Sequence, residues 1–137
     1  MAKQTKLVPA ARPFLKWAGG KTQLLNEFSK RLPGGFKNGK ITKYVEPFIG
    51  GGAVFFYLNQ RFSFEKSYIC DVNEELILTY RVIQNSSKTL IAELETIESN
   101  YFSKSDEERE KYYYEIRTAF NQKLTELNFK RYNSEWI

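Results

Sequence analysis

Histidine is absent from this 137-residue chain, and Cys70 is its only cysteine. Zinc sites are built from several cysteine, histidine or carboxylate ligands, and the Ser-His-Asp triad needs a histidine base. We therefore expect neither a metal site nor histidine-based catalysis. A single cysteine also excludes an internal disulfide framework, which fits a reducing compartment, and we expect the cytoplasm.

Long apolar runs are also missing. No segment approaches the roughly 20 apolar residues of a membrane-spanning helix, and the N-terminus lacks the apolar segment of a secretory signal. We therefore expect no membrane association. Hydrophobic residues still make up 42% of the chain. That share is enough for the core of one folded domain and argues against general disorder.

The charge is unevenly distributed. Residues 1–40 carry nine Lys or Arg against one Glu, residues 41–90 carry five against five, and residues 91–137 carry seven against ten. A basic N-terminal part suits a polyanion such as nucleic acid. Alternatively, residues 1–12 form a flexible, solvated basic arm, and charge alone does not separate these two interpretations.

Periodicity and turn residues predict alternating helices and strands. We expect strands at 41–46 and 67–70, and helices at 22–32, 53–60, 73–84, from 86 or 87 onward, and 105–121. Asn73 is suited to cap one of these helices, and the run Ser105 to Glu108 has the spacing of a capping box. Strands that alternate with helices indicate an α/β fold with a parallel sheet.

The segment YVEPFIGGGAVFF, residues 44–56, places three glycines between a predicted strand and a predicted helix. Such a loop lets backbone N–H groups approach a ligand beside a helix N-terminus. Asp71 follows the next strand, nineteen residues after Gly52, where a carboxylate can accept both hydroxyls of a ribose. The pattern suits a dinucleotide or S-adenosylmethionine, although Phe55 at the third glycine position of G-x-G-x-x-G weighs against NAD. The alternative is a plain glycine turn followed by a helix-capping Asp-x-Asn.

The earlier segment FLKWAGGKTQLL, residues 14–25, contains a Gly-Lys-Thr sequence. A phosphate-binding loop, G-x-x-x-x-G-K-[ST], would need glycine where Leu15 stands and a strand before it. A nucleotide-phosphate site at Gly19-Gly20-Lys21-Thr22 is therefore a weak alternative. Taken singly, Trp17 also suits a core aromatic, and Lys21 a solvated charge at a helix start.

Three segments together resemble the DNA adenine methylase (Dam-type) family: PFLKWAGGK at 13–21, VEPFIGGGAVFF at 45–56 and DVNEELI at 71–77. They come in the order of that family, and YYYEIRTAFN at 112–121 resembles a helix that follows them there. The resemblance implies transfer of a methyl group from S-adenosylmethionine to N6 of adenine in double-stranded DNA. It also implies a Rossmann-like S-adenosylmethionine-dependent methyltransferase fold, in which helices flank a parallel sheet.

Carried over position by position, the resemblance implies a cofactor site made from three segments. Trp17 and Lys21 would contact S-adenosylmethionine from the N-terminal segment. Asp71 would hold the ribose. The glycine loop would wrap the methionine part, with Phe48 lining the pocket, and its matching residues are Glu46, Pro47, Phe48, Gly50 and Gly52.

The Asp-Pro-Pro-Tyr loop of that family has no counterpart here. The chain has four prolines, none adjacent to another, so no catalytic residue is assigned, and we expect a partial fold with an incomplete sheet. We expect residues 13–100 to be the cofactor-binding part and 101–137 the start of a helical target-recognition region. Such a fragment would be inactive alone and would self-associate or join a C-terminal half. The alternative is a non-catalytic remnant that binds S-adenosylmethionine or DNA.

Overall fold

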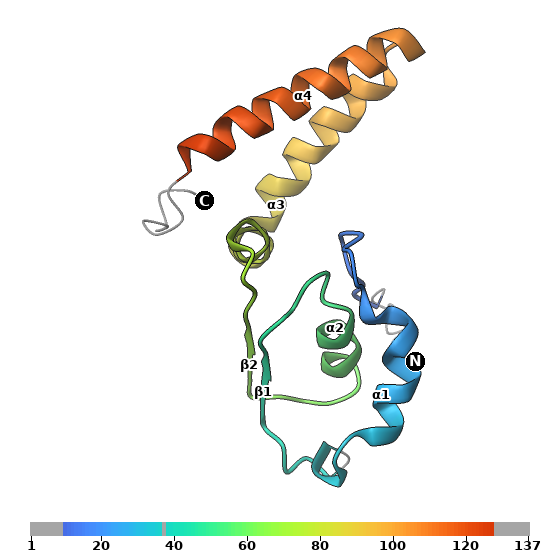
Figure 1. Cartoon of the computed structure of the whole chain (residues 1–137), viewed down its shortest axis with the longest axis vertical. Helices are drawn as coiled ribbons and strands as arrows, with labels where there is room; N and C mark the ends of the chain where they lie inside the picture. Colours follow the sequence, from blue (N-terminus) through green and yellow to red (C-terminus); the bar gives the residue numbers. More distant parts are fainter. Residues whose placement is uncertain (1–9, 37, 128–137) are drawn as a thin grey trace, which may run out of the picture. The chain divides into compact units, whose positions relative to one another are not determined.

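The computed structural model describes residues 10–36 and 38–127. The chain divides into two compact units, Met1–Val72 and Asn73–Ile137. Figure 1 colours both units along the sequence. Residues 1–9 of the predicted basic arm, together with Phe129 and Trp136, lie outside the described residues. No helix in the described part of the chain is long and apolar enough to cross a membrane.

The first unit contains a parallel pair of strands, β1 (Lys43–Glu46) and β2 (Lys66–Ile69), joined through helix α2 (Ala53–Asn59). Their register pairs Tyr44 with Ser67 and Glu46 with Ile69. Figure 1 shows α2 beside the sheet and α1 (Leu25–Arg31) beyond it. The predicted α/β class with a parallel sheet is confirmed, and the sheet formed by the described residues is incomplete, with two strands.

Both strands differ slightly from their predicted limits. The strand predicted from residue 41 begins at Lys43, because the N–H of Ile41 donates back to the carbonyl of Gly35 at 3.3 Å and closes a loop. The strand predicted at 67–70 covers Lys66–Ile69. A one-residue shift of this kind is expected, since end residues lack part of the ladder hydrogen bonding.

The first helical segment opens as a 3-10 turn, η1 (Lys21–Leu24), and continues as α1. Helix α1 ends at Arg31, and the next residue, Leu32, is extended with φ −64° and ψ 136°. The residue before a proline avoids the helical region, so Pro33 accounts for this end. A second short 3-10 turn, η2 (Gly34–Phe36), follows.

The second unit is a helical hairpin made of α3 (Glu74–Phe102) and α4 (Asp106–Glu126). The two helices predicted on either side of residue 86 are confirmed: they make up α3 and are joined at Ser86, where φ of −136° and ψ of 31° are non-helical. The predicted cap is confirmed, because the Asn73 side chain accepts from the Leu76 N–H at 2.8 Å. Helix α4 runs five residues past the predicted end at residue 121, since no glycine or proline stops it there.

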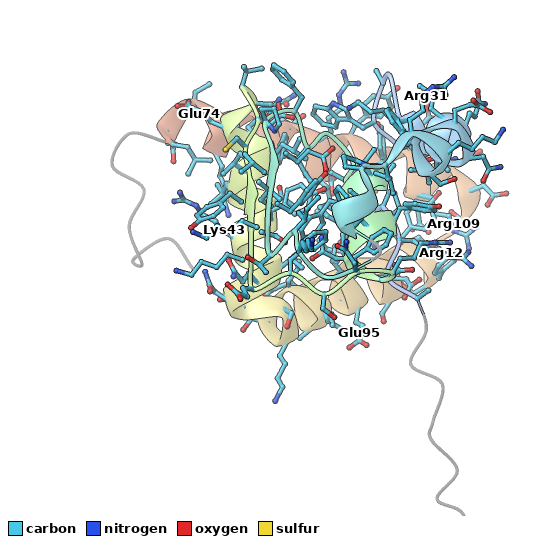
Figure 2. The ribbon with its side chains drawn as sticks, turned by 90° about the horizontal axis from the view of Figure 1, so that it is seen from below. Arg12, Arg31, Lys43, Glu74, Glu95 and Arg109 are labelled. Atoms are coloured by element: carbon cyan, nitrogen blue, oxygen red, sulfur yellow. The ribbon has the colours of Figure 1, made fainter. Side chains whose placement is uncertain are left out.

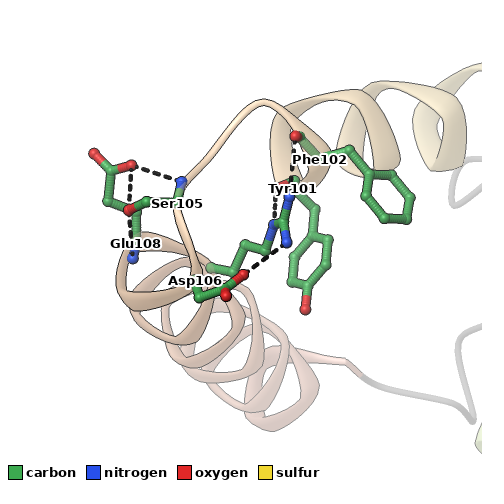
Figure 3. A network of polar contacts seen from close by, with 6 residues as sticks. Tyr101, Phe102, Ser105, Asp106 and Glu108 are labelled. Carbon is green, nitrogen blue, oxygen red and sulfur yellow. Dashed lines mark hydrogen bonds and ion pairs between the residues drawn. The ribbon is translucent and has the colours of Figure 1, made fainter.

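The turn between α3 and α4 is held by polar contacts (Figure 3). The predicted capping box is present: Ser105 accepts from the backbone of Glu108, and the Glu108 carboxylate accepts from the Ser105 N–H at 2.9 Å. The Arg109 guanidinium donates to the carbonyl oxygens of Tyr101 at 3.2 Å and Phe102 at 3.3 Å. It also pairs with Asp106 at 2.8 Å. These contacts satisfy carbonyl groups at the end of α3 that have no partner within the helix.

Candidate functional site

The glycine loop connects the end of β1 to the start of α2. Gly50 and Gly52 have φ of 49° and 80°, in the left-handed region that glycine enters without a steric penalty. Gly52 serves as the N-cap of α2, and its N–H donates to the carbonyl of Ile49 at 2.8 Å. The loop therefore turns sharply enough for α2 to begin directly after it.

The loop is attached to the end of β2. The N–H of Cys70 donates to the carbonyl of Glu46 at 2.8 Å, and the N–H of Ile49 donates to the carbonyl of Cys70 at 2.9 Å. The N–H of Gly50 donates to Asp71 Oδ2 at 2.9 Å. Parallel pairing thus places Asp71 against the glycine loop, as the spacing of these two motifs predicts.

The segment that precedes η1 packs against the same loop. A Cβ placed on Gly50 would lie 3.2 Å from Trp17 Cδ1, and one on Gly51 would lie 3.1 Å from the carbonyl oxygen of Leu15. The N–H of Gly20 donates to the carbonyl of Trp17 at 3.1 Å and closes a turn. The glycines of the two motifs therefore allow the two backbones to approach closely.

Lys21 joins the N-terminal segment to the loop after β1. Its Nζ donates to the carbonyl oxygen of Phe48 at 3.3 Å. Glu46, a residue that is only 7% exposed, lines the same cavity as Lys21. Burial raises the pKa of Glu46, while a hydrogen bond from Tyr44, the charge of Lys21 and the N–H of Phe55 act in the opposite direction.

These segments enclose one open cavity of about 760 Å³, which lies wholly in the first unit. Its volume is in the range of small-molecule sites. Among its lining residues are six that the sequence singles out: Trp17, Lys21, Glu46, Phe48, Gly50 and Asp71. The structure brings these six together. Pro47 and Gly52 are not among the lining residues; Pro47 is exposed, and Gly52 is buried at the N-cap of α2.

Sequence reasoning missed several lining residues. Phe14 and Leu15 face the cavity from the N-terminal segment, and Val54 faces it from the first turn of α2. An apolar pair directly before Lys16-Trp17 is a weak signal in the sequence. The signal becomes clear only when the segment is seen to fold over the glycine loop.

Among the described residues, no cluster of three or more cysteine, histidine or acidic side chains forms a potential metal site. The cavity instead combines aromatic and aliphatic surface with two carboxylates, Glu46 and Asp71, and three cationic side chains, Arg12, Lys16 and Lys21. It lies at the carboxyl end of a parallel sheet, where α/β proteins bind their ligands. Fold and site together are those of an α/β protein with a cavity at the carboxyl end of its parallel strands.

The family model for D12 class N6 adenine-specific DNA methyltransferases matches residues 17–137. The chain belongs to this family, which confirms the resemblance drawn from the three motifs. No solved structure showed a significant match.

Named relatives agree with this assignment. The chain is 49% identical over 111 residues to type II methyltransferase M.MjaIII of Methanocaldococcus jannaschii, covering 81% of this chain and 38% of the relative. It is 36% identical over 110 residues to the DNA adenine methylase of Haemophilus influenzae, covering 80% and 34%. It is 34% identical over 125 residues to the DNA N-6-adenine-methyltransferase of Escherichia phage P1, covering 89% and 14%. The chain thus spans less than two fifths of the length of these relatives.

Proposed function

We propose that this chain is the cofactor-binding part of an enzyme that transfers a methyl group from S-adenosylmethionine to N6 of adenine in double-stranded DNA. One observation supports this most directly: Trp17, Lys21, Glu46 and Asp71, taken from separate motifs, line one cavity in a chain of the D12 family. The names of the relatives also suggest a role in a restriction–modification system.

The residues of the cavity fit the proposed cofactor. Asp71 supplies a carboxylate for ribose hydroxyls, while Trp17 and Phe48 offer aromatic surface to the adenine or to the sulfonium. Glu46 suits the positively charged methionine part, and Lys21 suits its carboxylate. Gly50 has no side chain, so the backbone of the loop can approach a bound cofactor closely. Pro47 and Gly52 do not line the cavity and contribute to the conformation of the loop. When bound, S-adenosylmethionine would supply the reactive methyl group on its sulfonium sulfur.

The test is calorimetric titration of the chain with S-adenosylmethionine. We expect saturable binding that Asp71→Asn weakens by tenfold or more, since a charged acceptor for ribose hydroxyls is lost. The matched control is Asp106→Asn, the same chemical change in the second unit, which should bind like the wild type. Absence of binding to the folded wild-type chain would overturn the proposal.

Catalysis should need more than this chain. Methyl transfer is a direct displacement, which requires the amine and the methyl to be held in line at contact distance. The chain contains no Asp-Pro-Pro-Tyr sequence to hold the amine, so we expect no measurable methylation of duplex DNA by the chain alone. We expect activity once a C-terminal half from a longer D12 relative is added in trans. Robust turnover by the chain alone would refute the assignment as an inactive part.

Exposed cations on the first unit support a DNA partner. Figure 2 labels Arg31 and Lys43, which are exposed, and Arg12, which is exposed and also lines the cavity. Part of the charge is compensated, because Glu27 pairs with Lys30 at 2.7 Å and with Arg31 at 2.8 Å. We therefore expect weak binding to a DNA duplex with a strong dependence on salt. Fluorescence anisotropy with a labelled duplex at two salt concentrations measures this.

A non-catalytic remnant that binds S-adenosylmethionine or DNA is the second candidate function. It is favoured by the presence of the cavity in a sequence that contains no Asp-Pro-Pro-Tyr. The trans experiment separates the two candidates, since a remnant would bind the cofactor without restoring methylation. The assignment of residues 13–100 and 101–137 to cofactor and target-recognition parts, and self-association, stay predictions.

A further inference from the structure

Tyr44 connects an aromatic cluster to the cavity. Its ring stacks on Phe64 at a centroid distance of 5.4 Å. Phe36 packs edge-to-face against Phe64 at 6.0 Å and against Phe62 at 5.2 Å. Aromatic contacts of this geometry hold a ring in one orientation. Tyr44 itself does not line the cavity.

The hydroxyl of Tyr44 reaches the carboxylate of Glu46. It donates to Glu46 Oε2 at 2.5 Å. The two residues are two positions apart on β1, and therefore lie on the same face of the sheet. Glu46 lines the cavity. The aromatic cluster therefore acts on the site through a single hydrogen bond.

A carboxylate as buried as Glu46 is costly unless other groups stabilise its charge. Three groups do so, each from a different element: the Tyr44 hydroxyl from β1, the Lys21 ammonium from η1 and the Phe55 N–H from α2. Burial and the neighbouring Glu46 raise the pKa of Tyr44, so its hydroxyl keeps its proton and remains a donor at neutral pH. The pKa of Glu46 is nevertheless raised, because burial outweighs the three groups.

We propose that Tyr44 is a positioning residue that holds the Glu46 carboxylate in place, and ionised, for the positively charged part of a ligand in this cavity. The ligand class is a nucleoside that carries a sulfonium or ammonium group. This inference rests on the proposed function, and adds that the Tyr44 hydroxyl, held by the aromatic cluster, helps to keep Glu46 charged. Tyr44 acts through Glu46 and does not touch the ligand.

A pH profile of binding tests the proposal. Binding of S-adenosylmethionine to the wild-type chain is measured by calorimetry between pH 5 and 7, below the pKa of the ligand's own α-amino group, so that the ligand keeps both positive charges. A cation prefers the ionised carboxylate, so affinity should rise as pH increases through the raised pKa of Glu46 and then level off. Tyr44→Phe keeps the ring and removes the donor, which raises the pKa of Glu46 further. Its profile should shift to higher pH, with binding roughly tenfold weaker below the midpoint.

Methylthioadenosine, which lacks both positive charges, is the reference ligand. Its affinity should show no such rise with pH, and Tyr44→Phe should leave it unchanged if the cavity stays intact. Tyr68→Phe is the matched control variant, because Tyr68 lies on the neighbouring strand and its ring is 49% exposed. It should have the wild-type profile for both ligands.

Each outcome is decisive. If the folded wild-type chain binds neither ligand, the proposed function fails. If it binds S-adenosylmethionine and Tyr44→Phe leaves the pH midpoint unchanged, the role of Tyr44 is overturned while the proposed function stands. If Tyr44→Phe does not fold, Glu46→Gln is the variant that tests the inference. Glu46→Gln should flatten the pH profile of binding. A wild-type profile in Glu46→Gln would overturn the inference.

Discussion

The N–H of Gly50 donates a hydrogen bond of 2.9 Å to Asp71 Oδ2, across 21 positions of the sequence. This bond joins the glycine loop after β1 to the residue that follows β2. It explains how a loop with two left-handed glycines keeps one conformation beside an open cavity. It also makes the loop sensitive to the loss of one carboxylate.

Asp71→Ala should therefore loosen the glycine loop. A hydrogen bond to a charged group contributes about 1.5–3 kcal/mol, and we expect a loss near the low end of that range because Asp71 is only partly buried. Hydrogen exchange of the Gly50 amide should become markedly faster, and urea unfolding should show the lost free energy. Unchanged protection of Gly50 would contradict the role given to this bond.

Gly50→Ala should disturb the packing of Trp17. A side chain at φ 49° is strained, and the added Cβ would lie 3.2 Å from the indole. We expect a loss of about 1–2 kcal/mol and a shift in the fluorescence of Trp17. The chain has two tryptophans, so the measurement is made with Trp136 replaced by Phe. Gly34→Ala is the control, because a Cβ there meets no atom within 4 Å.

Removing the cap of α4 should weaken the helical hairpin. Ser105→Ala deletes the hydroxyl that accepts from the Glu108 N–H, and loss of such a cap costs about 1 kcal/mol. Circular dichroism during thermal unfolding should show a lower Tm. Ser103→Ala is the control, since Ser103 lies at the end of α3 and does not contribute to the capping box.

The same box makes the second unit sensitive to acid. Hydrogen bonds from the backbone and side chain of Ser105 lower the pKa of Glu108 below its ordinary value of 4.5. A carboxyl with a lowered pKa in the folded state stabilises the fold above 4.5, and this stabilisation is lost as pH falls through the lowered pKa. The Tm of the wild type should therefore fall more between pH 6 and 3 than that of Ser105→Ala. Equal slopes would show that the box does not act on Glu108 in solution.

Arg109→Ala should separate the end of α3 from the start of α4. It removes two hydrogen bonds to carbonyl groups and the ion pair with Asp106 (Figure 3). We expect a destabilisation of about 1–2 kcal/mol, measured by urea unfolding. Arg109→Lys should restore only part of it, because an ammonium lacks the planar fork that reaches several oxygens at once. Arg117→Ala, which changes an exposed arginine further along α4, is the control.

Much of the local structure could be predicted because its causes are local. Asn73 and Ser105 cap helices through hydrogen bonds to residues three positions away. Pro33 ends a helix by steric conflict with the residue before it. The end of α4 was predicted too early, since a helix without a stop signal continues until its context ends it. The break at Ser86 lies where the sequence predicts that one helix ends and the next begins.

The amino-acid sequence alone determined the family, the α/β class, the glycine loop and the position of Asp71 after the second strand. These features depend on the order of motifs and on turn-forming residues that are neighbours in the sequence. Only the tertiary structure decided which of these residues share a cavity. Lys21 reaches the carbonyl of Phe48 across 27 positions, and Pro47 and Gly52 do not line the cavity although they belong to the same motif. Such contacts depend on how strand pairing and the left-handed glycines place distant backbones, and no short pattern encodes that placement.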